Sequence, residues 1–224
     1  MSHRLLPQIL RVAQTALTVL VVAAVLLSAT TALAEGGRER EGFQLIFGAG
    51  IGYLTTTPSV DGFGGGPETT VDGFGFAGML GAGYSLNPSL SVGGVVLAGG
   101  HIVGPQVTVD GVSADNDADI IFDIIGPYVD WSPMGAGGGL RVVGIVGLGT
   151  MEDGNDDTDA VTLGVGGSLG VGWDWWVGDE WALGALARIN VLQTSTEIEL
   201  GEAGKANVSY FTIAPAVMTT LAWQ

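Results

Sequence analysis

Eight stretches of this sequence alternate between large apolar residues and small or polar ones, and this pattern constrains the fold more than any other feature. The stretches lie at residues 43–54, 73–85, 89–102, 118–131, 139–151, 160–176, 181–194 and 208–223. Because successive side chains of an extended chain point to opposite faces, a period of two predicts β-strands that have one apolar face. After residue 34 there is no apolar run long enough for a membrane-spanning helix. The sequence therefore predicts an all-β protein.

The connections between these stretches alternate between short and long. Short connections lie at 86–88, 132–138 and 177–180, and long ones at about 55–72, 103–117, 152–159 and 195–207. The long connections carry most of the Asp and Glu residues. Short turns at one end and long loops at the other are typical of a barrel that crosses a membrane, and the stretches are long enough for a tilted crossing. We therefore expect an eight-stranded antiparallel transmembrane β-barrel over residues 42–224.

The N-terminal segment differs in composition from the rest of the chain. Two arginines precede an almost unbroken apolar run at 16–27, and a small-x-small cleavage pattern ends at Ala34. This order is typical of a secretory signal peptide. We expect residues 1–34 to be a cleavable signal peptide and residues 35–41 to be a short, solvated polar tail. The alternative is an uncleaved membrane anchor, which the shortness of the apolar run disfavours.

The composition excludes several classes of function. The chain has 7 Lys and Arg against 23 Asp and Glu, a net charge of −16, and no Cys. Nucleic-acid binding needs clustered basic residues, so this class is excluded. The absence of cysteine excludes disulfides, thiolate metal sites and a cysteine nucleophile. A mean hydropathy of +0.45 argues against a disordered chain.

Aromatic residues gather near the ends of the predicted strands. All six Trp lie toward the ends that the short connections join. Because indole and phenol rings favour the boundary between membrane and water, we expect two aromatic girdles on the outer face. The first holds Phe43, Tyr84, Tyr128, Trp173, Trp175, Trp181 and Trp223, and the second holds Tyr53, Phe74, Phe76 and Phe211.

Together these features resemble the small eight-stranded outer-membrane barrels of Gram-negative bacteria, such as OmpX and the transmembrane part of OmpA. The last stretch adds a more specific sign, because apolar residues from Phe211 to Trp223 alternate as in the C-terminal strand that the outer-membrane assembly machinery reads. This chain departs from that pattern by ending in Trp223-Gln224. The resemblance implies a monomer in the outer membrane, with membrane lipid, lipopolysaccharide and the assembly machinery as partners.

The face opposite the apolar one would line the barrel interior, and it is rich in glycine. The interior of an eight-stranded barrel is barely wide enough for its own side chains, so close packing without a ligand is one expectation. The alternative is a small apolar cavity for a lipid tail or a hydrocarbon, because glycine leaves room. Pro127 and Pro215 lack a backbone donor inside predicted strands, and we expect a bulge or a waterlike partner there.

Five charged residues fall on the predicted interior face, namely Asp119, Asp123, Arg141, Asp174 and Arg188. Arg141 and Asp174 lie near the end with the short turns, and Arg188 and Asp123 lie at mid-height. Because an arginine in a medium of low dielectric constant needs a carboxylate partner, we predict that Arg141 pairs with Asp174 and Arg188 with Asp123, or with Asp119. Such pairs would plug the barrel or gate it.

The acidic loop at 152–159 is the one candidate metal site. Five carboxylates, those of Glu152, Asp153, Asp156, Asp157 and Asp159, supply the hard oxygen ligands that Ca²⁺ and Mg²⁺ prefer. Their spacing does not fit an EF-hand. The loop is either a solvated, self-repelling surface or a weak divalent-cation site that bridges to lipopolysaccharide, and no other cofactor is expected.

No set of residues predicts catalysis. The one histidine after residue 34, His101, has no serine or aspartate near it in sequence that would complete a nucleophilic site. We therefore predict a non-enzymatic protein that contributes to membrane integrity or to surface interactions through acidic extracellular loops. One alternative is a narrow conduit or binding site for a small hydrophobic molecule. Another is a secreted lipocalin-like barrel, whose richest apolar face would then have to face water.

Overall fold

The computed structural model describes residues 40, 42–60, 69–101, 106–110, 112–115, 120–135, 138–153, 161–199 and 205–224. Their strands are β1 (Gly42–Val60), β2 (Thr69–Asn87), β3 (Leu90–His101), β4 (Gln106–Val109), β5 (Val112–Asp115), β6 (Ile120–Trp131), β7 (Gly139–Asp153), β8 (Val161–Trp176), β9 (Trp181–Glu199) and β10 (Lys205–Trp223). The predicted signal peptide lies outside the described residues. Within them, no helix is long and apolar enough to cross a membrane.

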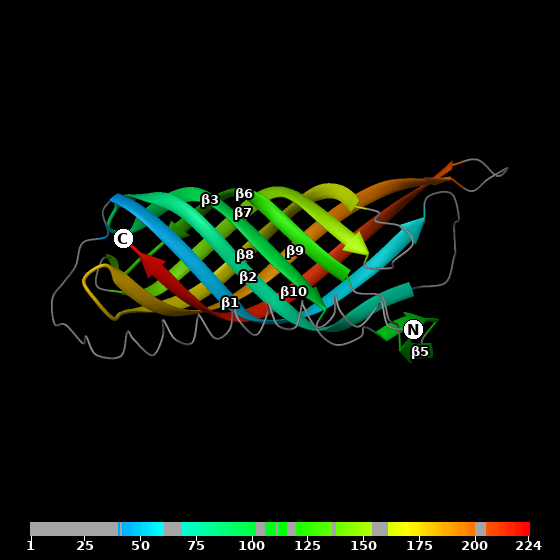
Figure 1. The fold of residues 1–224 in the computed structure, drawn as a ribbon, viewed down its shortest axis with the longest axis horizontal. Coiled ribbons are helices and arrows are strands. Elements are labelled where there is room, and N and C mark those ends of the chain that lie inside the picture. Colours follow the sequence, from blue (N-terminus) through cyan, green and yellow to red (C-terminus); the bar gives the residue numbers. More distant parts are fainter. Residues whose placement is uncertain are drawn as a thin grey trace, which may run out of the picture.

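Eight of the strands close into a barrel, as the sequence predicts. Neighbours pair antiparallel in the order β1, β2, β3, β6, β7, β8, β9 and β10, and β10 pairs back onto β1. Closure leaves no unpaired strand edge. An open edge would expose unsatisfied backbone N–H and C=O groups to hydrocarbon, which costs several kcal/mol per group. Figure 1 shows the tilted strands, with the C-terminus and the short turns at one end and the long connections at the other. The placement of the two sets of connections at opposite ends is therefore as predicted, but the strand bounds leave 61–68 and 200–204 as connections where 55–72 and 195–207 were expected.

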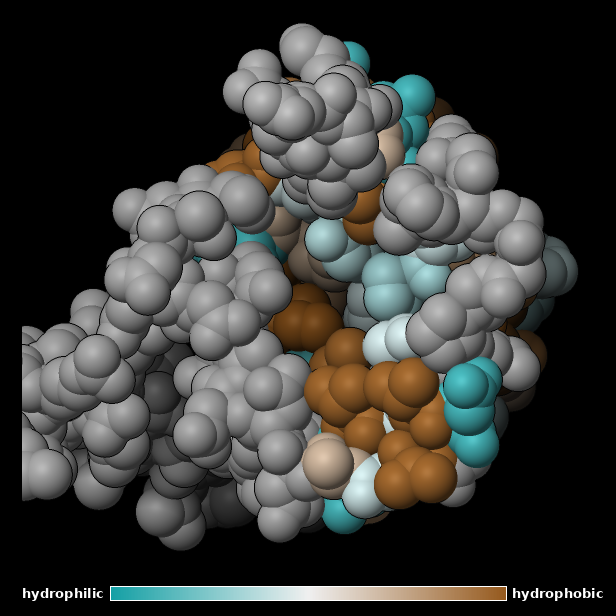
Figure 2. Space-filling view, turned by 90° about the vertical axis from the view of Figure 1, so that its right-hand side faces the viewer, coloured by the Kyte–Doolittle hydropathy of each residue, from teal (hydrophilic) through white to brown (hydrophobic). Residues whose placement is uncertain are grey.

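Four strands extend further than predicted. β1, β2, β9 and β10 each span 19 residues and run into the segments expected to be loops. The β9–β10 hairpin projects beyond the rest of the barrel at its right-hand end in Figure 1. At this end, seen face on in Figure 2, apolar residues lie beside polar ones at the rim.

A short hairpin lies within the predicted loop 103–117. β4 pairs with β5, and it also pairs with the start of β2, over Thr69–Asp72. Asp110 adopts a positive φ of 50° at the turn. An Asp-Gly pair between alternating residues is a strong signal for a two-residue hairpin turn, and Asp110-Gly111 is such a pair. The sequence thus contained the signal for this hairpin, which the loop prediction missed.

The outer wall is apolar and the inner face is buried. Ile51, Phe74 and Leu163 are each about two-thirds exposed on the outside, whereas Leu97 and Ile124 are completely buried inside. A belt of large exposed apolar side chains around a closed barrel is the surface of a protein that lies in lipid. The lipocalin-like alternative is wrong, because that fold keeps its apolar side chains inside.

The face assignment of β6 is the reverse of the prediction. Ile120, Phe122 and Ile124 are buried, whereas Asp123 and Ile125 are exposed on the outer wall. Both faces of this strand carry large apolar residues, so alternation by itself does not distinguish them. Strand pairing does, because Ile124 lies opposite the buried Leu97 of β3 and Gly149 of β7. 

The two prolines interrupt the hydrogen-bonded ladder without shifting it. The β1–β10 pairing stops at Gly52–Ala216, skips two residue pairs at Pro215, and resumes in the same register. The β6–β7 pairing skips two pairs in the same way at Pro127. Of the two expectations, the bulge is therefore wrong at both places, and a waterlike partner stays a prediction. The missing donor is accommodated by a local gap in pairing rather than by an extra residue.

Candidate functional site

Side chains fill the barrel interior, and glycines make that possible. A Cβ added to Gly166 of β8 would lie 2.8 Å from the Cδ1 of Ile124, which belongs to β6 on the far side of β7. A Cβ at Gly99 would lie 2.5 Å from the ring of Phe122. These glycines therefore give space to large side chains of other strands. The described part of the interior is closely packed rather than a water-filled pore.

A group of four charged residues, which we call the basal cluster, lies at the end with the short turns. Its members are Arg40, Asp130, Arg141 and Asp174. Arg141 contacts Asp130 at 2.5 Å and Asp174 at 3.3 Å, and Arg40 contacts Asp174 at 2.8 Å. All four side chains are at most 4% exposed. Two positive and two negative charges meet there, so the cluster is electrically neutral and its desolvation is offset.

Further polar contacts extend the basal cluster into a layer across the barrel. Arg40 donates from Nη1 to the hydroxyl of Ser132, and its guanidinium lies 6.0 Å from the ring centre of Trp176. Beside it, Gln44 donates from Nε2 to the hydroxyl of Tyr128 at 2.5 Å. The side-chain amide of Gln224 in turn donates to the Gln44 carbonyl at 3.0 Å. This layer closes the barrel at the end with the short turns.

The basal cluster contains one predicted contact and two residues that sequence reasoning missed. The structure brings Arg141 and Asp174 together, as expected. Asp130 was missed because the faces of β6 were reversed. With the observed faces it lies on the inner side, opposite Val143 and two residues along β7 from Arg141. Arg40 was missed because residues 35–41 were expected to be solvated, and at Arg40, which is 3% exposed, that expectation is wrong.

Arg188 of β9 is a second buried arginine, and it lies in a different environment. It is 3% exposed and donates from Nη2 to the backbone carbonyl of Gly78 at 3.0 Å. Its Nε and Nη1 have no hydrogen-bond partner. No carboxylate in the described part of the chain pairs with it. The predicted partner Asp123 is on the outer wall, so that pairing is wrong, and Asp119 lies outside the described residues.

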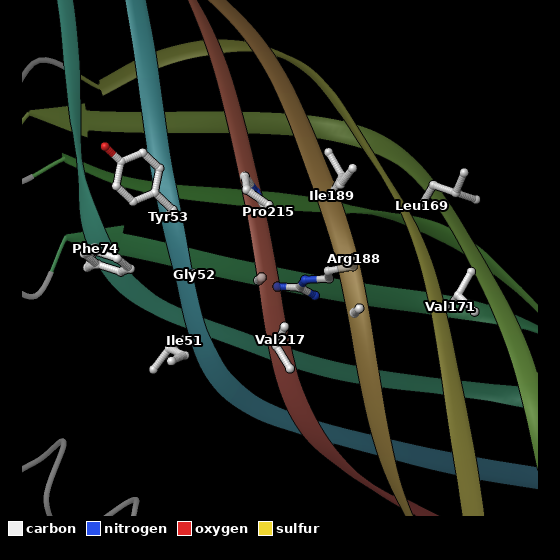
Figure 3. Close-up of a pocket in the computed structure, with 12 residues that line it drawn as sticks. Ile51, Gly52, Tyr53, Phe74, Leu169, Val171, Arg188, Ile189, Pro215 and Val217 are labelled. Atoms are coloured by element: carbon white, nitrogen blue, oxygen red, sulfur yellow. The ribbon is translucent and has the colours of Figure 1, made fainter.

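Small residues surround Arg188 on its neighbouring strands. Across the sheet it lies opposite Ala216 of β10, which lies opposite Gly52 of β1, which lies opposite Gly75 of β2. Figure 3 shows the side chain running from β9 behind β10. The row of Ala and Gly therefore makes room for the long arginine side chain inside the barrel.

The predicted girdle residues lie on the outer face, with one exception. Those that are exposed or partly exposed are Phe43, Tyr53, Phe74, Phe76, Tyr84, Trp173, Trp175, Trp181, Phe211 and Trp223. The rings of Phe43 and Trp223 meet edge to face at 6.2 Å, and the indole N–H of Trp223 donates to Glu180 at 2.8 Å. Tyr128 is the exception: it is buried inside, so its assignment to the girdle is wrong.

The predicted metal-binding loop lies mostly outside the described residues. Glu152 is exposed at the end of β7, and Asp153 follows it as the last residue of that strand. Asp156, Asp157 and Asp159 are not among the described residues. In the ranges that the structure does describe, no group of three or more acidic or histidine residues is arranged to hold a metal ion. Divalent-cation binding stays a prediction.

Two solved structures share this architecture. The outer membrane protein OprG from Pseudomonas aeruginosa matches with a TM-score of 0.54 and 16% identity, covering 84% of this chain and 99% of OprG. Neisserial surface protein A matches with a TM-score of 0.53 and 15% identity, covering 81% and 96% of the two chains. No protein-family model and no curated protein matches the sequence. The chain therefore has the closed eight-stranded fold of the small outer-membrane barrels of Gram-negative bacteria.

Proposed function

We propose that the protein is a non-enzymatic barrel of the Gram-negative outer membrane that contributes to membrane integrity or to surface interactions through acidic extracellular loops. The neutral basal cluster carries this proposal, because it closes one end of an already packed interior. An aqueous pore requires an open lumen, and the buried, mutually paired side chains of the basal cluster do not leave one. The apolar outer wall supports the membrane location.

The location has a direct test. Cells that express the chain are fractionated, and the outer-membrane fraction is run on a denaturing gel with and without boiling. A mobility shift on boiling, confined to that fraction, is the expected result, because a closed barrel resists the detergent until heated. A product in the soluble periplasmic fraction would contradict the proposal.

The role requires a comparison between strains. Cells that lack the gene are expected to become more sensitive to detergents and bulky antibiotics if the barrel maintains membrane integrity. Complementation uses the full chain and a variant in which Glu152, Asp153, Asp156, Asp157 and Asp159 become Asn or Gln. Equal rescue by both assigns the role to the barrel wall, and rescue by the full chain alone assigns it to the acidic loop. Unchanged sensitivity together with unchanged surface adhesion would refute both roles.

The same loop variant tests the proposed link to divalent cations and lipopolysaccharide. Bound Ca²⁺ raises the melting temperature of a folded protein in proportion to its preference for that state. Calcium is expected to raise the melting temperature of the full chain relative to chelator, and to leave the loop variant unchanged. Identical melting curves for the full chain in calcium and in chelator would rule out this site.

A second candidate function is the binding of a small hydrophobic molecule. A pocket of about 630 Å³ lies on the outer wall where β1, β2, β8, β9 and β10 pass. Its volume is in the range of small-molecule sites. Figure 3 shows its lining, which includes Ile51, Leu169, Ile189 and Val217. Saturable binding of an apolar fluorescent probe to the folded barrel tests this candidate.

A further inference from the structure

The pocket on the outer wall combines an apolar lining with a buried positive charge. Its lining is apolar except for Tyr53 and Arg188. We propose that this pocket binds a single-chain carboxylate lipid, with the hydrocarbon chain along the outer wall and the carboxylate paired with Arg188. This inference deepens the second candidate function and rests on it.

The first step in the inference is the incomplete hydrogen bonding of Arg188. A guanidinium has five N–H donors, and the structure gives this one a single acceptor, the carbonyl of Gly78. Its Nε and Nη1 are buried without a partner. A carboxylate accepts two parallel hydrogen bonds from one guanidinium and neutralises it at the same time. An uncharged ligand can accept the hydrogen bonds but does not neutralise the guanidinium, so the site favours an anion.

The second step is access from the outer wall to Arg188. The pocket lies over the place where the β1–β10 pairing skips two residue pairs at Pro215. Gly52 and Ala216, which face inward there, also line the pocket. At this place the wall lacks part of its hydrogen-bonded ladder, and its inward residues Gly52 and Ala216 are small, whereas the next inward residue of β1, Leu54, is buried beside the gap. Figure 3 shows Arg188 directly behind β10 at this height.

The third step concerns the class of anion. The remaining lining is hydrocarbon, contributed mainly by outward residues such as Leu169, Ile189 and Val217. A phospholipid or lipopolysaccharide phosphate carries a large hydrated headgroup, which is held at the membrane surface. A carboxylate at the end of one hydrocarbon chain is compact enough to enter the gap in the β1–β10 pairing at Pro215. The chemistry of the pocket thus favours a long-chain fatty acid over a headgroup phosphate.

The test compares a charged probe with its neutral analogue. The folded chain in detergent micelles is titrated with the fluorescent fatty acid cis-parinaric acid and, separately, with its methyl ester. The native protein is expected to bind the acid at least tenfold more tightly than the ester. Arg188→Met is expected to remove that preference by weakening acid binding, and Arg188→Lys to retain part of it.

Two tryptophan substitutions supply the matched controls. Val217 lies in the pocket and is 62% exposed, and Val146 lies on β7, outside the pocket lining, and is 65% exposed. Val217→Trp is expected to fill the pocket and weaken binding of both probes, whereas Val146→Trp leaves both unchanged. The shift in gel mobility on boiling verifies that each variant is folded, and the Val217 variant keeps the test decisive if the Arg188 variants do not fold.

The outcomes separate the two levels of the proposal. Binding of both probes with equal affinity, or an acid preference that survives Arg188→Met, would overturn the role of Arg188 while leaving the hydrophobic-molecule candidate in place. Equal weakening by both tryptophan variants would overturn the assignment to this pocket. Failure of the native chain to bind either probe would overturn both the inference and the candidate function on which it rests.

Discussion

The basal cluster and Arg188 bury arginines in the same barrel under different electrostatic conditions. Arg141 and Arg188 are almost equally inaccessible, at 1% and 3% exposure. Arg141 has two carboxylate partners, whereas Arg188 has one backbone carbonyl. The two sites therefore differ not in burial but in whether carboxylates neutralise the charge of the arginine. The difference is that the charges at the end of the barrel neutralise one another, whereas no carboxylate among the described residues neutralises Arg188.

The largest expected effect comes from breaking the basal cluster at its shared acid. Asp174 contacts both Arg40 and Arg141, so Asp174→Asn leaves Arg141 with Asp130 alone and leaves Arg40 with no carboxylate of the cluster. Breaking a buried ion pair costs about 3–5 kcal/mol of folding free energy. Urea unfolding of the barrel refolded into lipid vesicles measures the loss. Glu152→Gln, at an exposed carboxylate, is the control, with an expected change within about 0.5 kcal/mol.

A smaller loss is expected when only the terminal arginine is removed. Arg40→Ala deletes the contacts with Asp174 and Ser132 but leaves Arg141 between its two acids. Hydrogen bonds to charged groups contribute about 1.5–3 kcal/mol each, so we expect a loss near 2 kcal/mol. The same unfolding assay applies. A loss equal to that of Asp174→Asn would show that Arg40, rather than Asp174, is the centre of the cluster.

Substitution of Arg188 is expected to increase the free energy of unfolding rather than decrease it. Arg188 is a buried charge with no carboxylate partner among the described residues, so replacing it by an apolar side chain of similar length removes a desolvation cost. Arg188→Met is therefore expected to raise the free energy of unfolding by about 1–2 kcal/mol in the absence of ligand. Unfolding of the delipidated protein in micelles measures this gain. Destabilisation by more than 1 kcal/mol would contradict the distinction between the two sites.

The smallest effect is expected beside the basal cluster. Tyr128→Phe removes the hydroxyl that accepts a hydrogen bond from Gln44 and preserves the ring. One buried hydrogen bond contributes about 1 kcal/mol. Tyr84→Phe, on the exposed outer face, is the matched control and is expected to change stability by much less. If the two substitutions have equal effects, the hydrogen bond between Gln44 and Tyr128 contributes nothing to closure.

The strands and their order followed from the sequence because the period of two and the turn signals are clear even where both faces carry apolar residues, and in strands such as β8 the outer face is plainly the more apolar one. In β6, by contrast, Ile121 and Ile125 on one face match Phe122 and Ile124 on the other. There the face is set by the register with β3 and β7, which a single-strand pattern does not contain. That one reversal accounts for the wrong placement of Asp123 and Tyr128.

The candidate site was only half predictable for a related physical reason. The proximity of Arg141 and Asp174 follows from counting heights along neighbouring strands, which is a local calculation. The position of Arg40 depends on its contacts with Asp174 and Ser132. The absence of Asp123 from the surroundings of Arg188 depends on the reversed face of β6. Both are tertiary properties, set by contacts between residues that are distant in sequence.

Closure of the interior is tested most directly by electrical recording. The purified barrel is inserted into a planar lipid bilayer, and the current is followed under an applied voltage in potassium chloride. A packed interior sealed by the basal cluster predicts no steady conductance steps for the native chain. Stable, ohmic conductance steps from the native chain, absent in a boiled sample, would show that the interior is open and would contradict its sealing by the basal cluster.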